Sequence, residues 1–156
     1  MQVAAAARPF ADWDRMVNSG PMSESEFARM IGADSLETIA MGDGYLRQRL
    51  TIPESARAGF SAVFSGTFAC WADWVGCWVI AAGKDGAEAR DLLDRVRIQG
   101  ITVDIVGNTT SSTLLLESRV DSTNGRFAFV TVNMTEEDGT PLATGRLRLA
   151  YARKAE

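Results

Sequence analysis

The sequence predicts an α+β domain in which an antiparallel sheet wraps around one long buried helix. Residues 64–83, FSGTFACWADWVGCWVIAAG, contain a single charged side chain, and such a composition is typical of a helix covered on nearly all sides. Four strand-like segments follow, and the Asn-Gly and Asp-Gly pairs at 124–125 and 138–139 predict tight hairpins between the last three. The 156 residues suffice for one domain with its own core, so we treat residues 1–156 as a single unit.

The first 22 residues predict an N-terminal extension that carries one short amphipathic helix. This helix is expected over residues 9–18 and to end at the NSGP turn. A second helix is expected within SESEFARMIG, because Ser23 and Glu26 have the spacing of a capping box. Gly32 is then a plausible C-terminal stop for this helix.

Two strands are expected in SLETIAMGDGYLRQRLTIP, joined by the GDG turn. Residues 45–50 alternate between polar or aromatic and apolar or neutral side chains, which is typical of a strand with one buried face. Pro53 ends the second strand, because proline cannot donate a ladder hydrogen bond.

The long helix is predicted over residues 65–82. Trp71, Trp74 and Trp78 form one stripe at helical spacing, which we interpret as core packing, with a ligand-lining ring as the alternative. The length also fits a membrane span, but Asp73 lies at its centre and amphipathic strands follow, so we expect a buried helix and no membrane partner. A polar excursion after it is expected to carry a short helix.

The remaining strands are ITVDIVG, TLLLESRVDS, RFAFVTVNMTEE and PLATGRLRLAYARK. The hairpin signals between the last three predict an antiparallel meander. A sheet of this kind, curved around one apolar helix, explains why the helix lacks a polar face.

The composition excludes several classes of function. The chain has no histidine, which removes the Ser-His-Asp and Cys-His mechanisms and histidine-ligated zinc. A net charge of −4 argues against a nucleic-acid partner. Cys70 and Cys77 lie two helical turns apart, roughly 10 Å, which is too far for a disulfide. We expect both to be reduced, in a cytoplasmic protein without a signal peptide and without a metal site.

Asp73 is the candidate functional residue that the sequence itself singles out. A lone carboxylate is costly to bury in so apolar a segment unless a partner or a chemical task holds it there. In an apolar cleft it would have a raised pKa and free lone pairs, which suits a nucleophile or a general base. The alternative is a structural aspartate bonded to backbone or to Thr102.

The order of elements and the motif residues resemble the hotdog fold, and most closely its acyl-CoA thioesterase branch that includes phenylacetyl-CoA thioesterases. The similarity covers roughly residues 27–154. FSG at 64–66 stands where this family has a glycine-rich turn before the central helix, and WAD at 71–73 stands where it has an acidic LAD-like motif. GITVDI at 100–105 and the closing segment NGRFAFVTVNMTEEDGTPLATGRLRLAYARK resemble its later strands. The family's usual His, first Gly and upstream Asn are replaced by Phe64, Ser65 and Ala58.

The resemblance implies roles for particular residues. Asp73 would attack the thioester or activate water, Ser65 and Gly66 would bind the oxyanion at the start of the helix, and Thr102 would hold the water. Each has a structural alternative: Ser65 as an ordinary N-cap, Gly66 as a packing glycine and Thr102 as a strand former.

The resemblance also implies a substrate and an assembly. Four basic residues near the C-terminus are candidates for contacting the phosphates of coenzyme A, with a solvated strand face as the alternative: Arg146, Arg148, Arg153 and Lys154. Coenzyme A would be part of the substrate, and no separate cofactor is expected. The family assembles as a homodimer or a dimer of dimers with joined sheets, and the active site lies at the subunit boundary.

Two functions follow from these observations. The first is an acyl-CoA or acyl-carrier thioesterase that uses Asp73. The second is a non-catalytic hotdog module that binds an acyl thioester or a lipid-like ligand, which the missing His and Asn favour. A hotdog dehydratase fits poorly because such enzymes usually use histidine. The acyl group and the pathway do not follow from the sequence.

Overall fold

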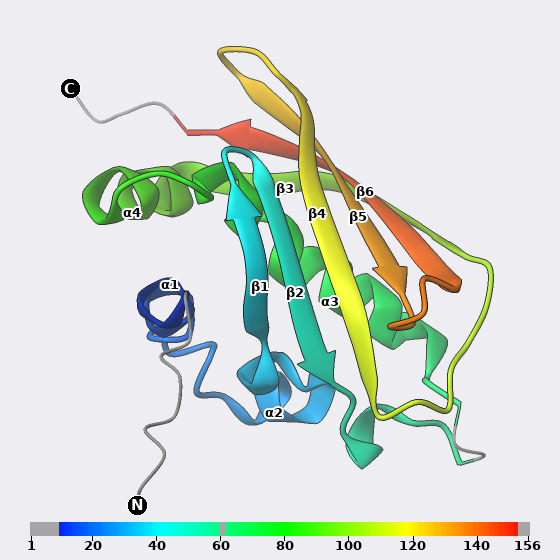
Figure 1. The fold of residues 1–156 in the computed structure, drawn as a ribbon. Coiled ribbons are helices and arrows are strands. Elements are labelled where there is room, and N and C mark those ends of the chain that lie inside the picture. The colour runs from blue at the N-terminus through cyan, green and yellow to red at the C-terminus, as the bar shows by residue number, and fades with distance from the viewer. Residues whose placement is uncertain (1–9, 60–61, 153–156) are drawn as a thin grey trace, which may run out of the picture.

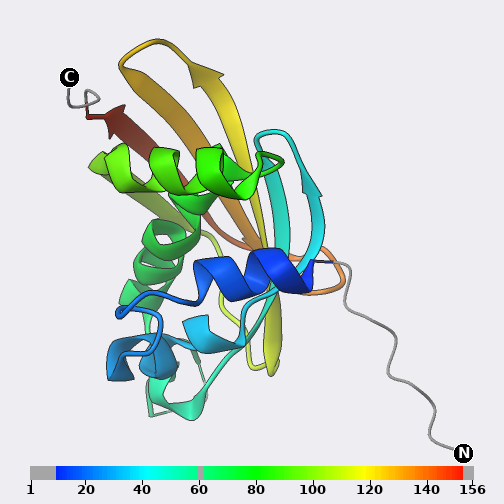
Figure 2. The ribbon, with the colours of Figure 1, turned by 90° about the vertical axis from the view of Figure 1, so that its left-hand side faces the viewer.

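The computed structural model describes residues 10–59 and 62–152, which form one antiparallel sheet with helices on one side of it (Figures 1 and 2). Its strand order is β1-β2-β4-β5-β6-β3. The strands are β1 (Glu37–Gly42), β2 (Tyr45–Thr51), β3 (Val96–Ile105), β4 (Thr113–Thr123), β5 (Phe127–Thr135) and β6 (Pro141–Tyr151). The helices are α1 (Ala11–Val17), α2 (Glu26–Ile31), α3 (Ser65–Gly76) and α4 (Gly86–Arg95), with 3-10 turns η1 (Ala33–Ser35), η2 (Glu54–Ala56) and η3 (Trp78–Ala81).

The N-terminal helix α1 is attached to the edge strand β1 by a buried carboxylate. Asp14 accepts hydrogen bonds from the Thr38 hydroxyl at 2.7 Å and from the Thr38 peptide N–H at 3.2 Å. The β1–β2 register shifts between Thr38 and Ala40, so the ladder is irregular beside this amide. The predicted helix over residues 9–18 is thus confirmed from Ala11 onward, while Pro9 lies outside the described residues.

Asp14→Ala is expected to lower the free energy of unfolding by about 1–3 kcal/mol, because it leaves the buried Thr38 amide without its acceptor. Denaturant titration of both proteins measures the change. Asp12→Ala is the matched control, since Asp12 lies on the same helix but is exposed. Equal stability of the Asp14 and Asp12 variants would contradict the anchoring role.

Helix α2 begins two residues later than the capping-box spacing predicts. Its N-cap is Ser25, whose hydroxyl accepts from the Ala28 N–H at 3.2 Å, whereas the Ser23 hydroxyl donates to the carbonyl of Val17, the last residue of α1. The predicted stop is confirmed: Gly32 adopts a left-handed φ of 77°. A Cβ there would lie 2.4 Å from the Thr51 carbonyl oxygen, so this position requires glycine.

The central helix α3 is shorter than the predicted span of residues 65–82. It ends at Gly76, and the chain continues through the 3-10 turn η3. A side chain at Gly76 would clash with Leu147, whose Cδ2 lies 2.7 Å from the ideal Cβ position. A Cβ at Gly145 on β6 would likewise lie 2.7 Å from the Cβ of Ala72. The helix therefore packs against β6 with glycines at two contact points.

Trp71 lies at the centre of the core. Its side chain is fully buried, its indole N–H donates to the Ile31 carbonyl at 2.6 Å, and its ring meets Phe68 edge-on. Trp74 and Trp78 are only partly buried, and Trp78 lies beyond the end of α3. The interpretation of the tryptophans as core residues thus holds fully for Trp71.

The closing meander of β4, β5 and β6 is confirmed, with antiparallel pairing across both predicted hairpins. Strand β3 begins at Val96, five residues before the expected ITVDIVG segment, because the predicted short helix α4 ends at Arg95. β3 pairs only with β6 and so forms an edge of the sheet.

The expectation that the central helix is buried on nearly all sides is wrong for one face. Ser65, Gly66 and Asp73 are exposed, and Cys70 and Trp74 are half-buried. The sheet stops at edge strand β3, so nothing in the described chain covers this side of α3. We call it the open face of α3.

Candidate functional site

The start of α3 presents free backbone donors. Phe64 is the N-cap residue and no side chain caps the helix, so Ser65 occupies the first helical position and is not the N-cap. Among the described groups, the Gly66 N–H has no acceptor. Because a helix N-terminus also carries a partial positive charge, this end of α3 is suited to binding an oxyanion.

Asn108 fixes the backbone just before this helix start. Its side chain accepts from the Val63 N–H at 2.8 Å and donates to the Val63 carbonyl at 2.9 Å. The Phe64 N–H donates to the Ala56 carbonyl at 2.9 Å. The sequence alone assigned Asn108 no role, since a contact across 45 residues leaves no local pattern.

Asp73 lies on the open face and carries the charge there. Its side chain makes no hydrogen bond or ion pair with any described residue, so neither the backbone bond nor the Thr102 bond of the structural alternative is present. Although the residue is exposed, neighbouring atoms partly desolvate the carboxylate and raise its pKa above the ordinary value. A carboxylate with free lone pairs and a raised pKa can act as a base or a nucleophile.

Gly66 and Asp73 share one face of α3 but lie far apart along it. Seven residues separate them, which is two helical turns or roughly 10 Å. A reacting carbonyl places its oxygen and its carbon about 1.2 Å apart. One thioester therefore cannot contact the Gly66 N–H and the Asp73 carboxylate of the same chain.

Phe64, which replaces the family's usual histidine, lies over the start of the helix. Its side chain is 63% exposed, and its Cε1 atom lies 3.1 Å from where a Gly66 Cβ would be. The ring supplies no acid or base, and it narrows access to the Gly66 N–H.

The two cysteines, Cys70 within α3 and Cys77 at its C-cap, lie on either side of Asp73 in the chain, and both are free and half-buried. Desolvation, followed by the negative charge of Asp73, raises the pKa of Cys70 and brings that of Cys77 to about 11. Both remain protonated at neutral pH and are poor nucleophiles. Asp73 is thus the side chain on this face that is best suited to act as a base or a nucleophile.

Phe27 of α2 is a second residue that sequence reasoning did not assign to the site. Its ring lies 6.4 Å from that of Trp74, the residue after Asp73. Phe27 is 44% exposed, so it presents an apolar surface next to Trp74. In the sequence, Phe27 is one apolar residue of an ordinary amphipathic helix, so no pattern marks it as part of a site.

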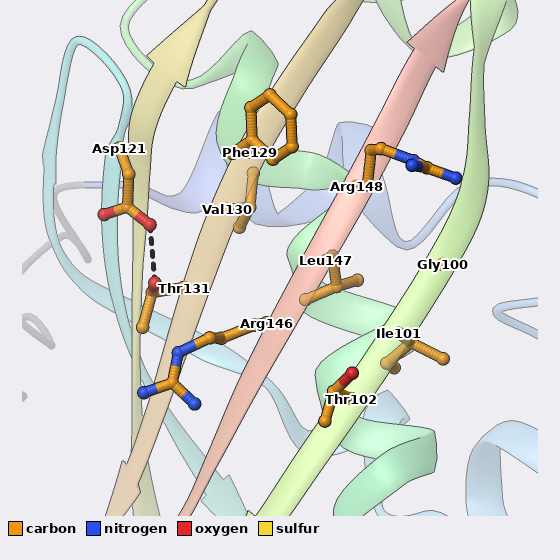
Figure 3. A pocket seen from close by; sticks show the side chains of 10 residues that line it. All are labelled: Gly100, Ile101, Thr102, Asp121, Phe129, Val130, Thr131, Arg146, Leu147 and Arg148. Atoms are coloured by element: carbon orange, nitrogen blue, oxygen red, sulfur yellow. Dashed lines mark hydrogen bonds between the residues drawn. The ribbon is translucent and has the colours of Figure 1, made fainter.

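Thr102, Arg146 and Arg148 are not brought to Asp73. Gly145 and Leu147 of β6 contact α3, so the alternate residues Arg146 and Arg148 project from the outer face of the sheet. Thr102 pairs with Arg146 and shares that face, as Figure 3 shows with the helices behind the sheet. In a single chain Thr102 cannot hold a water at Asp73. Arg153 and Lys154 lie outside the described residues.

No protein-family model matches the sequence, and no curated protein matches it significantly. Solved structures do match the fold. Zebra fish thioesterase superfamily member 2 superposes with a TM-score of 0.72 over 90% of this chain and 94% of its own, at 16% identity. The chain has the hotdog fold.

Other hotdog structures give the same result. A thioesterase from Haemophilus influenzae has a TM-score of 0.68 at 12% identity, covering 90% of this chain and 92% of its own. A hypothetical thioesterase from Streptococcus pneumoniae, solved as an aspartate-to-alanine mutant, has a TM-score of 0.63 at 10% identity, covering 74% and 89%. These superpositions establish the predicted fold, and at such low identities they establish nothing further.

The described part of the chain has neither a metal-binding cluster nor a membrane-spanning helix. No three side chains of the types that ligate metals come together there. No described helix is long and apolar enough to cross a membrane.

Asp73→Asn is expected to raise the melting temperature slightly at pH 7. The unfolded carboxyl titrates near 3.8 and the folded one higher. Between these pKa values the folded chain holds more protons, so the free energy of unfolding falls as pH rises through that window. Asparagine removes the penalty. The rise should stay below about 4 °C and vanish below pH 3.8. A lower melting temperature at pH 7 would reveal a structural bond to Asp73.

Proposed function

We propose that this protein hydrolyses an acyl thioester, with Asp73 as the group that attacks the carbonyl or deprotonates the attacking water. One observation carries the proposal: the only charged residue of an apolar segment lies exposed on the open face of α3, with a raised pKa and no partner among the described residues. The thioesterases among the structures with the same fold support it.

The chemistry needs no histidine. In the nucleophilic route, a carboxylate oxygen of Asp73 bonds to the acyl carbon, the C–S bond breaks and the thiolate leaves; water then hydrolyses the anhydride. In the general-base route, Asp73 takes a proton from water as the water attacks the same carbon. The products of both routes are a carboxylic acid and a thiol.

The oxyanion site must come from a second copy of the chain. Because Gly66 lies two turns from Asp73 on the same helix, the Ser65–Gly66 end of a second α3, running in the opposite direction, would meet Asp73 of the first. The edge strand β3 offers unpaired backbone groups for such an association. The exposed apolar side chains of Ile101 and Ile105 on β3, and of Val106 just after it, would be covered. We therefore propose a homodimer, alone or within a dimer of dimers.

The substrate carrier is coenzyme A or an acyl carrier protein. Arg146 and Arg148 lie behind the sheet, so with joined β3 edges they would not reach a coenzyme A whose thioester is at Asp73 of the same chain. Thr102 is on that outer face as well and is left out of the mechanism. With both thiols reduced and protonated, we keep the cytoplasm as the proposed location.

A non-catalytic module that binds an acyl thioester or a lipid-like ligand is the second candidate. The observation that favours it is the Phe64 ring over Gly66, where the family's usual histidine would supply a polar group. The apolar neighbours Phe27 and Trp74 would serve binding equally well.

Thiol release from a panel of short, long and aromatic acyl-CoAs tests the proposal. Turnover above the spontaneous rate with at least one substrate supports a thioesterase. No turnover on any substrate, with saturable binding of a non-hydrolysable acyl-CoA analogue, would establish the binding module instead.

A further inference from the structure

Val63, the residue before the N-cap of α3, is held by hydrogen bonds on both sides. On one side it forms an isolated antiparallel bridge with Arg57, next to the bond from the Phe64 N–H to the Ala56 carbonyl at 2.9 Å. On the other side, the Asn108 side chain accepts from the Val63 N–H at 2.8 Å and donates to the Val63 carbonyl at 2.9 Å. The Asn108 amide therefore completes the pairing of Val63 as a neighbouring strand would.

The loop that carries Asn108 is itself fixed to the sheet. The N–H groups of the two preceding residues both donate to the Leu142 carbonyl on β6, at 2.9 and 3.1 Å. The next residue, Thr109, is buried, and its hydroxyl donates to the Glu136 carboxylate at 2.6 Å. Asn108 thus stands on an anchored support and can hold the chain that it contacts.

Arg57 joins the same two segments a second time. Its side chain is only 9% exposed and donates to the carbonyls of Thr109 and Ser111, at 3.3 and 2.6 Å. Because its backbone also bridges Val63, Arg57 ties the loop of Asn108 to the chain that leads into α3. Two independent side chains therefore keep this entry to the helix in place.

The first turn of α3 has little other support. No side chain caps the helix, and residues 64–66 are all exposed. The first buried residue of the helix is Thr67, which follows Gly66. The direction of the Gly66 N–H is therefore set by the backbone that enters the helix, and Asn108 fixes that backbone.

We propose that Asn108 is a positioning residue that keeps the Gly66 N–H aimed at the oxyanion of the reaction, a role that rests on the proposed function. Asn108 contacts no reacting atom and acts through Val63. Oxyanion donors are effective because they are in place before the charge develops, and such groups must be held within about 0.5 Å. In the proposed homodimer, Asn108 of one copy thus serves the reaction at Asp73 of the other.

Steady-state kinetics of Asn108→Ala with the preferred acyl-CoA test this role. We expect kcat to fall about tenfold or more, since removing an oxyanion donor outright costs about a hundredfold or more. KM should stay within about twofold, because the weakened interaction is made only in the transition state. The pH at which the rate is half-maximal should not move, because the carboxylate of Asp73 is unchanged.

Asn124→Ala is the matched control. The Asn124 side chain also accepts from two backbone N–H groups, both at 2.9 Å, but it does so in the hairpin between β4 and β5. Both asparagines are exposed, so both variants should keep the circular dichroism spectrum of the wild type. Asn124→Ala should leave kcat and KM unchanged.

A second measurement needs no turnover. NMR relaxation should give Gly66 of the wild type an order parameter of about 0.85, which is typical of rigid backbone. In Asn108→Ala we expect this value to move towards the flexible range below about 0.6, and in Asn124→Ala to stay unchanged.

Three results would overturn the role of Asn108: an unchanged order parameter at Gly66, an unchanged kcat in an active enzyme, or equal effects of Asn108→Ala and Asn124→Ala. A wild type that releases no thiol is a different result. It would overturn the thioesterase proposal, whereas a loss of order at Gly66 in Asn108→Ala would still support the positioning of that donor by Asn108.

Discussion

Asp73→Asn is expected to reduce thiol release from the preferred acyl-CoA by about a hundredfold or more, which corresponds to near 3 kcal/mol of activation free energy. Asparagine has the same shape and leaves the packing of α3 intact, but it can neither attack the carbonyl nor accept a proton from water. The rate of wild-type protein should fall as the pH drops through the raised pKa of Asp73, because only the ionised carboxylate is active.

Asp104→Asn is the charge-matched control for this experiment. Asp104 is an exposed carboxylate on β3 that pairs with Arg146 on the outer face, so its loss should leave turnover unchanged. If Asp73→Asn retained most of the activity while folding normally, the reacting group would have to lie elsewhere. The proposed catalytic role of the open face of α3 would then be wrong.

Trp71→Ala is expected to lower the free energy of unfolding by about 3–5 kcal/mol, the range for removing a large buried aromatic side chain. Trp71 is completely buried between α3 and the rest of the core, and the variant would also leave the Ile31 carbonyl without its indole donor. Equilibrium unfolding in urea, monitored by far-ultraviolet circular dichroism, measures the change.

Two further variants separate the causes. Trp71→Phe keeps an aromatic ring but removes the donor to Ile31, and it should lose about 1–3 kcal/mol. Trp74→Ala removes a half-buried indole from the same helix and should lose less than Trp71→Ala does. Equal losses in the two alanine variants would contradict the central position of Trp71.

The elements of the fold follow from local patterns in the sequence. Asn124-Gly125 and Asp138-Gly139 predict the hairpins because few other pairs adopt the backbone angles that such turns need. Gly32 predicts the end of α2 for a similar reason. The boundary errors arose where two residues compete for one role, as Ser23 and Ser25 do for the cap of α2, or where a helix ends before its apolar run does, as α3 does at Gly76.

The candidate site was only partly accessible from the sequence. Asp73 is conspicuous because charge is rare in its segment, and its spacing from Gly66 follows from helix geometry alone. The position of Thr102 on the outer face could not be predicted, because strand residues alternate between faces and the register against β6 decides which face each takes. That register depends on the whole sheet, so a motif in one strand does not reveal it.

The two-turn spacing between Gly66 and Asp73 has a genetic consequence. If each active site takes its backbone N–H donor from one chain and its carboxylate from the other, two chains with different inactivating substitutions can complement each other in a heterodimer. A heterodimer of an Asp73→Asn chain with a Gly66→Val chain carries both lesions in one centre and neither in the other. Each variant is expected to be inactive alone, but co-expression should give heterodimers with about half of the wild-type turnover, because one of their two active sites is intact. This result is called intragenic complementation.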